Sequence, residues 1–175
     1  MKPLLTGLCC VLAFPGFARA AVLQSAADGF LIEHAYRITA TPAAAWQVLV
    51  HPEHWWPREH TWSGNTANLS LLPEAGGCFC ERWSDGGTEH ARVIHVRTNQ
   101  LLRLEGALGP MQEMAVTGVL TIRLTSDDGG TEAKVTYRVS GDLSHKLAEL
   151  APVVDKVLGQ QFGGFAALAS KPAAQ

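Results

Sequence analysis

The strongest constraint on the fold is a helical pattern near the C-terminus, in residues 151–170. Apolar residues and one glutamine recur there at three- and four-residue steps: Val154, Val157, Leu158, Gln161, Phe162, Phe165 and Leu168. This spacing predicts one face of an α-helix. Pro152 suits the first turn of that helix, where its missing N–H has no partner to lose.

Three glycines, Gly159, Gly163 and Gly164, interrupt this helical pattern. Each glycine costs a helix about 1 kcal/mol relative to alanine. Three of them predict either a close approach by another backbone or space left for another molecule. Because protein interiors normally pack without voids, we interpret the missing side-chain volume as a cavity beside the helix.

Seven segments before this helix read as β-strands, and two of them, 116–124 and 133–139, alternate between apolar and polar residues more clearly than the others. Such alternation is typical of an antiparallel sheet that is covered on one side. Thr41 and Pro42 predict the start of a short helix after the first strand, and another short helix is expected at about 144–150. The other five strands are expected at 30–38, 68–72, 78–83, 90–96 and 100–105.

The order of these elements resembles the helix-grip fold of the START-like (SRPBCC) superfamily, which includes pollen allergens, polyketide cyclases and lipid-transfer domains. The resemblance covers about residues 30–170. It rests on ITATPAAAW at 38–46, HP at 51–52 with WWP at 55–57, PEAGG at 73–77, LLRL at 101–104 and GT at 130–131. It implies an α+β helix-grip fold, with a curved antiparallel sheet of about six or seven strands wrapped around the long C-terminal helix. It also implies a deep cavity for an apolar ligand, and it implies no particular reaction, because such folds carry many functions.

The first twenty residues have the pattern of a signal peptide. Lys2 precedes an apolar run at 4–17 that is too short to span a bilayer, and Ala18-Arg19-Ala20 fits a signal-peptidase site. Cleavage before Ala21 would leave one domain, residues 21–175, in the periplasm or outside the cell. An uncleaved anchor and lipidation of Cys9 are the alternatives, although no small residue stands just ahead of Cys9. No later segment of the sequence could span a membrane.

Charge and composition make nucleic acid an unlikely class of partner. Without Lys2 and Arg19, the 14 basic residues fall to 12 against 16 acidic ones, a formal charge of −4. The charges are scattered, and no basic block or glycine-rich phosphate loop is present. The sequence therefore predicts no nucleic-acid partner and no cofactor, and it defines no oligomeric state.

Cys78 and Cys80 point to the same face of a predicted strand. Three interpretations compete: buried free thiols, a disulfide, or soft-metal ligation with His95 or Met111. Cα atoms two residues apart on a regular strand lie about 6.5–7 Å apart, at the edge of disulfide geometry. The expected compartment favours oxidation, but buried free thiols that act as small apolar fillers are the leading interpretation.

A second candidate cluster contains His51, His54 and His60, near Glu53 and Glu59. Zinc binding by these side chains competes with loop capping and simple exposure to solvent. His51 and His54 would face together only on a helix, and Pro52 between them opposes a regular one. The sequence therefore commits to no metal site.

The predicted ligand site is the cavity between sheet and helix. We expect six side chains to line it: Tyr36, Trp83, Met111, Met114, Phe162 and Phe165. His34 or Arg103 would meet the polar end of the ligand, and Trp55, Trp56 and the loop at 106–114 would form the mouth. The alternatives are that the tryptophans are core residues, that Arg103 faces water and that His34 is an ordinary buried histidine.

Two classes of function fit these features. The first is a binding protein for a hydrophobic or amphipathic small molecule. The second is an enzyme of cyclase, dehydratase or hydrolase type that uses a cavity Glu or His as acid or base; Glu81 and Glu105 lie in predicted strands, but their faces are not defined. An outside alternative is metal or redox handling through Cys78 and Cys80. No nucleophile motif or pair of carboxylates is evident, so the binding protein is the prediction, with no catalytic residues assigned.

Overall fold

The structure, a computed structural model, describes residues 19–172, and their side chains from Ala21 onward. Its centre is one eight-stranded antiparallel sheet with the strand order β1-β2-β8-β7-β6-β5-β4-β3. The strands are β1 Arg19–Ala26, β2 Gly29–Ile38, β3 Leu69–Leu71, β4 Cys78–Trp83, β5 Gly86–Arg97, β6 Leu101–Glu105, β7 Thr117–Asp127 and β8 Gly130–Ser140.

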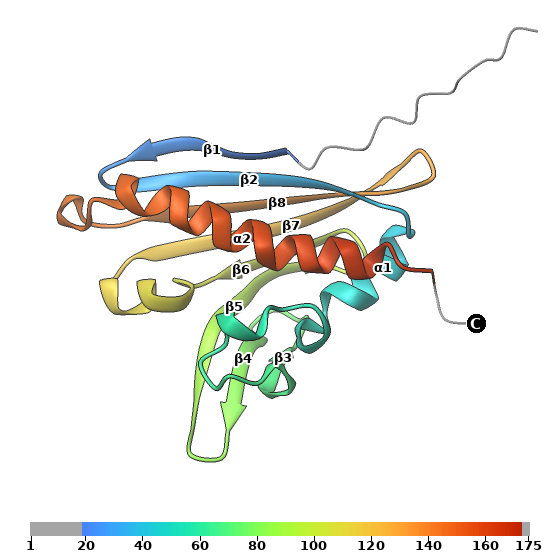
Figure 1. Cartoon of the computed structure of the whole chain (residues 1–175), viewed down its shortest axis with the longest axis horizontal. Helices are drawn as coiled ribbons and strands as arrows, with labels where there is room; N and C mark the ends of the chain where they lie inside the picture. The colour runs from blue at the N-terminus through green and yellow to red at the C-terminus, as the bar shows by residue number, and fades with distance from the viewer. Residues whose placement is uncertain (1–18, 173–175) are drawn as a thin grey trace, which may run out of the picture.

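The long helix α2, Leu147–Ala169, runs across one face of the sheet in front of β2 and β8 (Figure 1). The short helix α1, Pro42–Leu49, packs near its C-terminal end, while β3, β4 and β5 bend away from the direction of β1 and β2. The predicted α+β class and the helix-grip arrangement are therefore confirmed. No helix within residues 19–172 has both the length and the hydropathy needed to cross a bilayer.

Alternation along the central strands supplies the core. Leu120, Ile122 and Leu124 of β7 are buried, as are every second residue of β8 from Thr131 to Val139. They face a buried stripe of α2 that includes Leu158, Phe162 and Phe165. Burying each large apolar side chain contributes about 1.5–3 kcal/mol, and because α2 lies closest to β2 and β1, these two strands hold the helix to the sheet more than β7 and β8 do.

The sheet has one strand more than the sequence predicted. The additional strand, β1, pairs with β2 from Arg19 opposite Ala35 to Ala26 opposite Gly29. Its sequence, RAAVLQSA, lacks a clear alternation, and it overlaps the residues expected around signal-peptide cleavage. Of the predicted signal peptide, only Arg19 and Ala20 belong to the described residues.

The prediction for the start of the long helix was wrong. A single 3₁₀ turn, η5 at Leu143–His145, replaces the expected short helix, and α2 begins at Leu147 rather than after residue 150. Pro152 consequently lies inside α2, where it cannot donate to the carbonyl four residues earlier. By contrast, Thr41 caps α1 as expected, because its side chain accepts a hydrogen bond from Ala44 N–H at 3.3 Å.

Residues 51–68, which follow α1 and are called the tryptophan-rich segment below, form an irregular stretch, as expected from its prolines. It forms three 3₁₀ turns: η1 Pro52–His54, η2 Arg58–His60 and η3 Thr66–Asn68. Two indole N–H groups fix its path. Trp55 Nε1 donates to the Val48 carbonyl at 2.9 Å, and Trp56 Nε1 donates to the His60 carbonyl at 3.0 Å.

Candidate functional site

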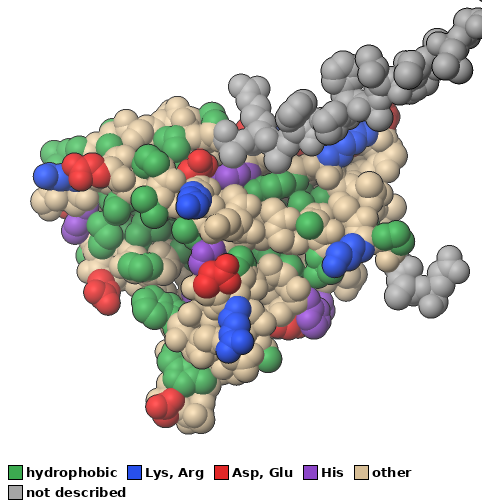
Figure 2. All heavy atoms as spheres, viewed as in Figure 1, with side chains coloured by type: hydrophobic (Ala, Val, Ile, Leu, Met, Phe, Trp, Pro, Cys, Tyr) green, Lys and Arg blue, Asp and Glu red, His purple; other side chains and the backbone are tan. Residues whose placement is uncertain are grey.

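A cavity of about 440 Å³ opens between α2, the tryptophan-rich segment and the loop before β7. This loop contains the 3₁₀ helix η4, Gly109–Met114. Apolar side chains gather on the left of the space-filling view, beside α2, where Figure 1 shows this loop (Figure 2). The cavity is lined by Trp56, Glu59, His60, Thr61, Trp62, His90, Leu108, Gly109, Pro110, Met111, Met114, Leu150, Val153, Val154, Val157, Leu158 and Gln161.

The helix contributes to this cavity through one stripe of side chains. Leu150, Val154, Val157, Leu158 and Gln161 are spaced at helical repeats, so they share a side of α2. This stripe is part of the apolar face that the sequence predicted. The opposite wall carries Met111 and Met114 from η4, flexible thioether side chains that adapt to different ligand shapes.

The glycines of α2 do not create the cavity, contrary to the prediction. A Cβ on Gly159 would lie 3.2 Å from His34 Cε1, and one on Gly164 would lie 2.7 Å from the Trp55 carbonyl oxygen. A Cβ on Gly163 would meet nothing within 4 Å, and Gly163 is not on the cavity wall. Gly159 and Gly164 therefore allow close packing on other sides of the helix, and the cavity volume comes from the irregular loops.

One buried acid–imidazole pair lies at the cavity wall. His90 of β5 lines the cavity, and its Nε2 lies 3.1 Å from Oε2 of Glu81 on the neighbouring strand β4. Glu81 is fully buried. Its carboxylate also accepts the backbone N–H groups of Trp62 at 3.0 Å and Ser63 at 2.5 Å. The carboxylate thus ties the tryptophan-rich segment to the sheet.

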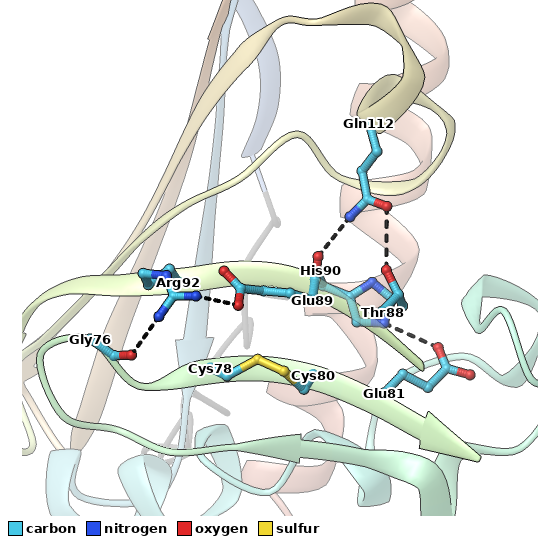
Figure 3. The surroundings of a disulfide bond; sticks show 9 residues. All are labelled: Gly76, Cys78, Cys80, Glu81, Thr88, Glu89, His90, Arg92 and Gln112. Carbon is cyan, nitrogen blue, oxygen red and sulfur yellow. Dashed lines mark hydrogen bonds and ion pairs between the residues drawn. A yellow bond between two sulfur atoms is a disulfide. The ribbon is translucent and has the colours of Figure 1, made fainter. Parts of the chain in front are cut away.

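A β-bulge places His90 in this position. Phe79 of β4 pairs with Ala91 and Cys80 pairs with Glu89, so His90 is the extra residue of β5. Because of the bulge, His90 and Ala91 both point inward and are buried, although they are consecutive in a strand. Glu89 and Arg92 then share the outer face, where their side chains form an ion pair (Figure 3).

The surroundings of the pair lower the pKa of both side chains. Burial alone would raise the pKa of Glu81, but hydrogen bonds from Ser63, Trp62 and His90 outweigh it and lower that pKa below 4.5. Burial lowers the pKa of His90 below 6.5, against the opposing effect of the Glu81 carboxylate. Near neutral pH the pair is therefore an ionised carboxylate beside a neutral imidazole.

Cys78 and Cys80 form a disulfide on the strand that carries Glu81 (Figure 3). Their Cα atoms are 5.3 Å apart, closer than on a regular strand. The register of β4 against β5 shifts between Phe79 and Cys80, inside the short loop that the disulfide closes. The structure therefore favours the disulfide over free thiols. The disulfide also argues against metal binding by Cys78 and Cys80, because a soft metal binds thiolates and the sulfurs of a disulfide are not thiolates.

The other polar residues proposed from the sequence lie away from this cavity. His34 Nε2 is 2.9 Å from Asp155 Oδ1 of α2, although the two atoms are not aligned as a hydrogen bond. Tyr36 stacks on His34, and its hydroxyl reaches the Gly159 carbonyl at 3.5 Å. Burial and the nearby Asp155 raise the pKa of Tyr36 to about 12. Arg103 Nε donates to Thr121 Oγ1 at 3.0 Å, so none of these groups lines the cavity.

The predicted aromatic and methionine residues divide between wall and core. Met111, Met114 and Trp56 line the large cavity. Trp55 and Phe162 border a second, much smaller space beneath it, and Phe165 is a buried contact of Trp55. Trp83 lies at the hairpin between β4 and β5, against Gly86.

Two members of the predicted histidine cluster, His51 and His54, are exposed and lie outside the cavity, whereas His60 and Glu59 line it. The 3₁₀ turn η1 brings His51 and His54 together, with Glu53 Oε1 at 2.9 Å from His51 Nδ1 and 3.8 Å from His54 Nε2. Pro52 was expected to keep the two rings apart, but a 3₁₀ turn accepts proline at its first position. The His51 side chain thus contacts the Glu53 side chain and makes no capping bond to the backbone of the turn.

Comparison with known proteins identifies the fold of this chain but assigns it to no family. No protein-family model matches the sequence, and no curated protein matches it. A Rhodobacter sphaeroides protein of solved structure is similar, with a TM-score of 0.57 and 18% identity over 86% of this chain and 97% of that one. Norcoclaurine synthase from Thalictrum flavum has a TM-score of 0.55 and 13% identity over 84% and 96% of the two chains. CalU16 from Micromonospora echinospora has a TM-score of 0.51 and 12% identity over 89% and 87%.

Proposed function

We propose that this protein is a START-like binding protein for a hydrophobic or amphipathic small molecule, which it holds in the cavity between α2 and η4. The observation that carries the proposal is the cavity itself, about 440 Å³ with a wall formed mainly by tryptophan, methionine, leucine and valine side chains. Ligand pockets in proteins have volumes of about 300–1,000 Å³ and are mostly apolar, with a few polar groups.

The entrance also fits an apolar ligand. Trp62 and Val153 line the cavity and are 50% and 61% exposed to solvent. Large apolar side chains exposed next to each other are costly in water, and they commonly mark a binding site. In this proposal they make the first contact with the ligand.

We place this binding protein in the periplasm or outside the cell, on the basis of the sequence at 1–20 and the disulfide between Cys78 and Cys80. Cleavage before Ala21 removes only the first two residues of β1. Intact-mass analysis of the exported protein should give a chain that begins at Ala21. A mass that includes residues 1–20, or acyl chains on Cys9, contradicts this location.

Native mass spectrometry of protein purified from its own compartment tests the binding function. The expected spectrum contains a folded species that carries one additional small molecule, which is released by organic solvent and extracted as an apolar compound. A spectrum of ligand-free protein from every preparation, together with no uptake of added apolar compounds, contradicts the proposal.

An enzyme of cyclase, dehydratase or hydrolase type is the second candidate. The observation that favours it is the Glu81–His90 pair, because such an enzyme needs an acid or base within reach of its substrate. Conversion of a bound compound during incubation, followed by mass spectrometry, distinguishes an enzyme from a carrier.

A further inference from the structure

The polar groups on the cavity wall include two atoms that have no partner. Gln161 of α2 is only 4% exposed, and its Oε1 has no hydrogen-bond partner among the described residues. His60 Nδ1, from η2, is buried and equally without a partner there. A buried polar atom without a partner costs about 1–3 kcal/mol. Both residues line the cavity, so each has an unpartnered polar atom close to its wall.

A further polar group on the wall, His90, has its protonation defined by Glu81. The carboxylate already accepts two backbone N–H groups, so it remains an acceptor and takes the Nε2–H of the imidazole. The neutral ring therefore carries its lone pair on Nδ1. Among the described residues the His90 ring makes no second hydrogen bond.

We propose that His90 Nδ1 is the proton acceptor for the hydroxyl group of an aromatic, phenol-like ligand. This inference rests on the proposed binding function and names the chemical class of its ligand. The ligand hydroxyl donates to Nδ1. If the proton moves completely, the O–H bond breaks, an Nδ1–H bond forms and the ligand keeps the electron pair as a phenolate. The imidazolium charge is then balanced by the Glu81 carboxylate across the Nε2–H bond.

An aromatic hydroxyl fits this wall better than an aliphatic one. The Trp56 and Trp62 indoles and the Met111 and Met114 thioethers favour contact with an aromatic ring. A phenol, with a pKa of about 10 like the tyrosine side chain, donates a stronger hydrogen bond to a neutral imidazole than an aliphatic alcohol does. Gln161 accepts or donates a further hydrogen bond to the same ligand.

Aromatic neighbours and a backbone hydrogen bond fix the position of the His90 ring. Its ring lies 4.9 Å from Phe79 and 6.4 Å from Trp56, between ring centroids. The backbone carbonyl of Glu89, the residue before His90, accepts a hydrogen bond from Gln112 of η4 at 2.8 Å (Figure 3). This bond ties the loop that carries Met111 and Met114 to the bulge. The acceptor and the opposite wall are thus fixed relative to each other.

The test compares two probes of nearly equal size, 2-naphthol and 2-methoxynaphthalene, of which only the first has a hydroxyl donor. Wild-type protein should bind 2-naphthol about tenfold more tightly, which corresponds to about 1.4 kcal/mol. In protein labelled with ¹⁵N-histidine, the non-protonated Nδ1 resonance of His90 should move toward the protonated range with 2-naphthol and not with the methyl ether. This resonance is assigned through contacts of the ring with Phe79 and Trp56, so the comparison requires no variant.

Two variants sharpen the comparison. His90→Phe should lose the preference for 2-naphthol over 2-methoxynaphthalene, whereas His95→Phe, at an exposed position of the same strand, should behave like wild type. Equal affinity for the two probes, or a preference for 2-naphthol without a change at Nδ1, overturns the assignment of His90 and leaves the binding function intact. If neither probe binds, the proposed binding function fails as well.

Discussion

Gly164 of α2 lies directly against the backbone of Trp55, so that a Cβ at position 164 would be only 2.7 Å from the Trp55 carbonyl oxygen. Trp55 in turn packs on Phe162 and Phe165, with ring centroids 5.5 and 5.6 Å apart. The absence of a side chain at Gly164 is therefore what allows the tryptophan-rich segment to close onto the helix. The adjacent Trp56 then reaches the cavity wall.

Gly164→Ala should destabilise the protein. The helix would gain up to about 1 kcal/mol in propensity, but the new methyl group would push the Trp55 backbone away, and such overpacking costs about 1–3 kcal/mol. Gly163→Ala is the matched control, because a Cβ there meets nothing within 4 Å, so it should stabilise by about 0.5–1 kcal/mol. Urea unfolding of both variants measures the difference. Equal stabilisation by the two alanines would show that Trp55 does not depend on Gly164.

The Glu81–His90 pair predicts that stability falls on acidification in two steps. His90 has a folded pKa below 6.5, so its contribution is fully present above pH 6.5 and is lost as the pH falls toward the folded pKa, because the unfolded chain takes up a proton first. Glu81 has a folded pKa below 4.5, so its contribution is lost by the same argument below pH 4.5. Urea unfolding at a series of pH values measures both.

The variant His90→Phe separates these steps. It should flatten the decline that begins at pH 6.5 and leave the decline below pH 4.5 in place, since the Trp62 and Ser63 N–H groups still hold the Glu81 carboxylate. A pH profile that does not change in the variant would contradict the assignment of the upper step to His90.

The disulfide predicts a modest contribution to stability. The covalent loop from Cys78 to Cys80 is very short, so it restricts the unfolded chain by only about 1–2 kcal/mol. Cys78→Ala combined with Cys80→Ala should lose about that amount in urea unfolding and retain ligand binding, since the disulfide does not line the cavity. Treatment of the wild-type protein with a thiol reductant should cause the same loss and increase the intact mass by two hydrogens. An unchanged mass after reduction, or stoichiometric metal that the double variant lacks, would contradict the disulfide.

Periodic patterns predicted the architecture because they report directly on burial. The alternation at 116–124 and 133–139 became β7 and β8, and the helical stripe from Val154 to Phe165 became the buried and cavity-lining side of α2. By contrast, β1 could not be predicted, because an edge strand with one neighbour needs little apolar alternation. The position of Pro152 inside α2 was missed because packing of Leu147 and Ala151, both fully buried, extends the helix beyond its local signals.

The site was harder to predict because it depends on a bulge. A regular β5 would place consecutive residues His90 and Ala91 on opposite faces, and only the unequal pairing with β4 turns both inward. Glu81 lies in a predicted strand and faces inward together with Phe79, two residues before it, so alternation with that buried aromatic residue was the available signal. Gln161 did have a signal, as the one polar residue in the apolar stripe. His34 lies elsewhere because it faces Asp155 of α2. Arg103 lies elsewhere because it is on the outer face of the sheet, where it donates a hydrogen bond to Thr121.

The most direct test of the binding function is a titration with N-phenyl-1-naphthylamine, a neutral apolar probe whose fluorescence increases in an apolar site. Val154 lies on the cavity wall, and Ala167 is an exposed residue of the same helix, so Val154→Trp and Ala167→Trp add the same side chain inside and outside the cavity. The wild type and Ala167→Trp should bind one probe per chain with equal affinity, and Val154→Trp should bind at least about tenfold more weakly, a loss of about 1.4 kcal/mol. No saturable binding by the wild type, or equal binding by Val154→Trp, would show that this cavity is not a ligand site.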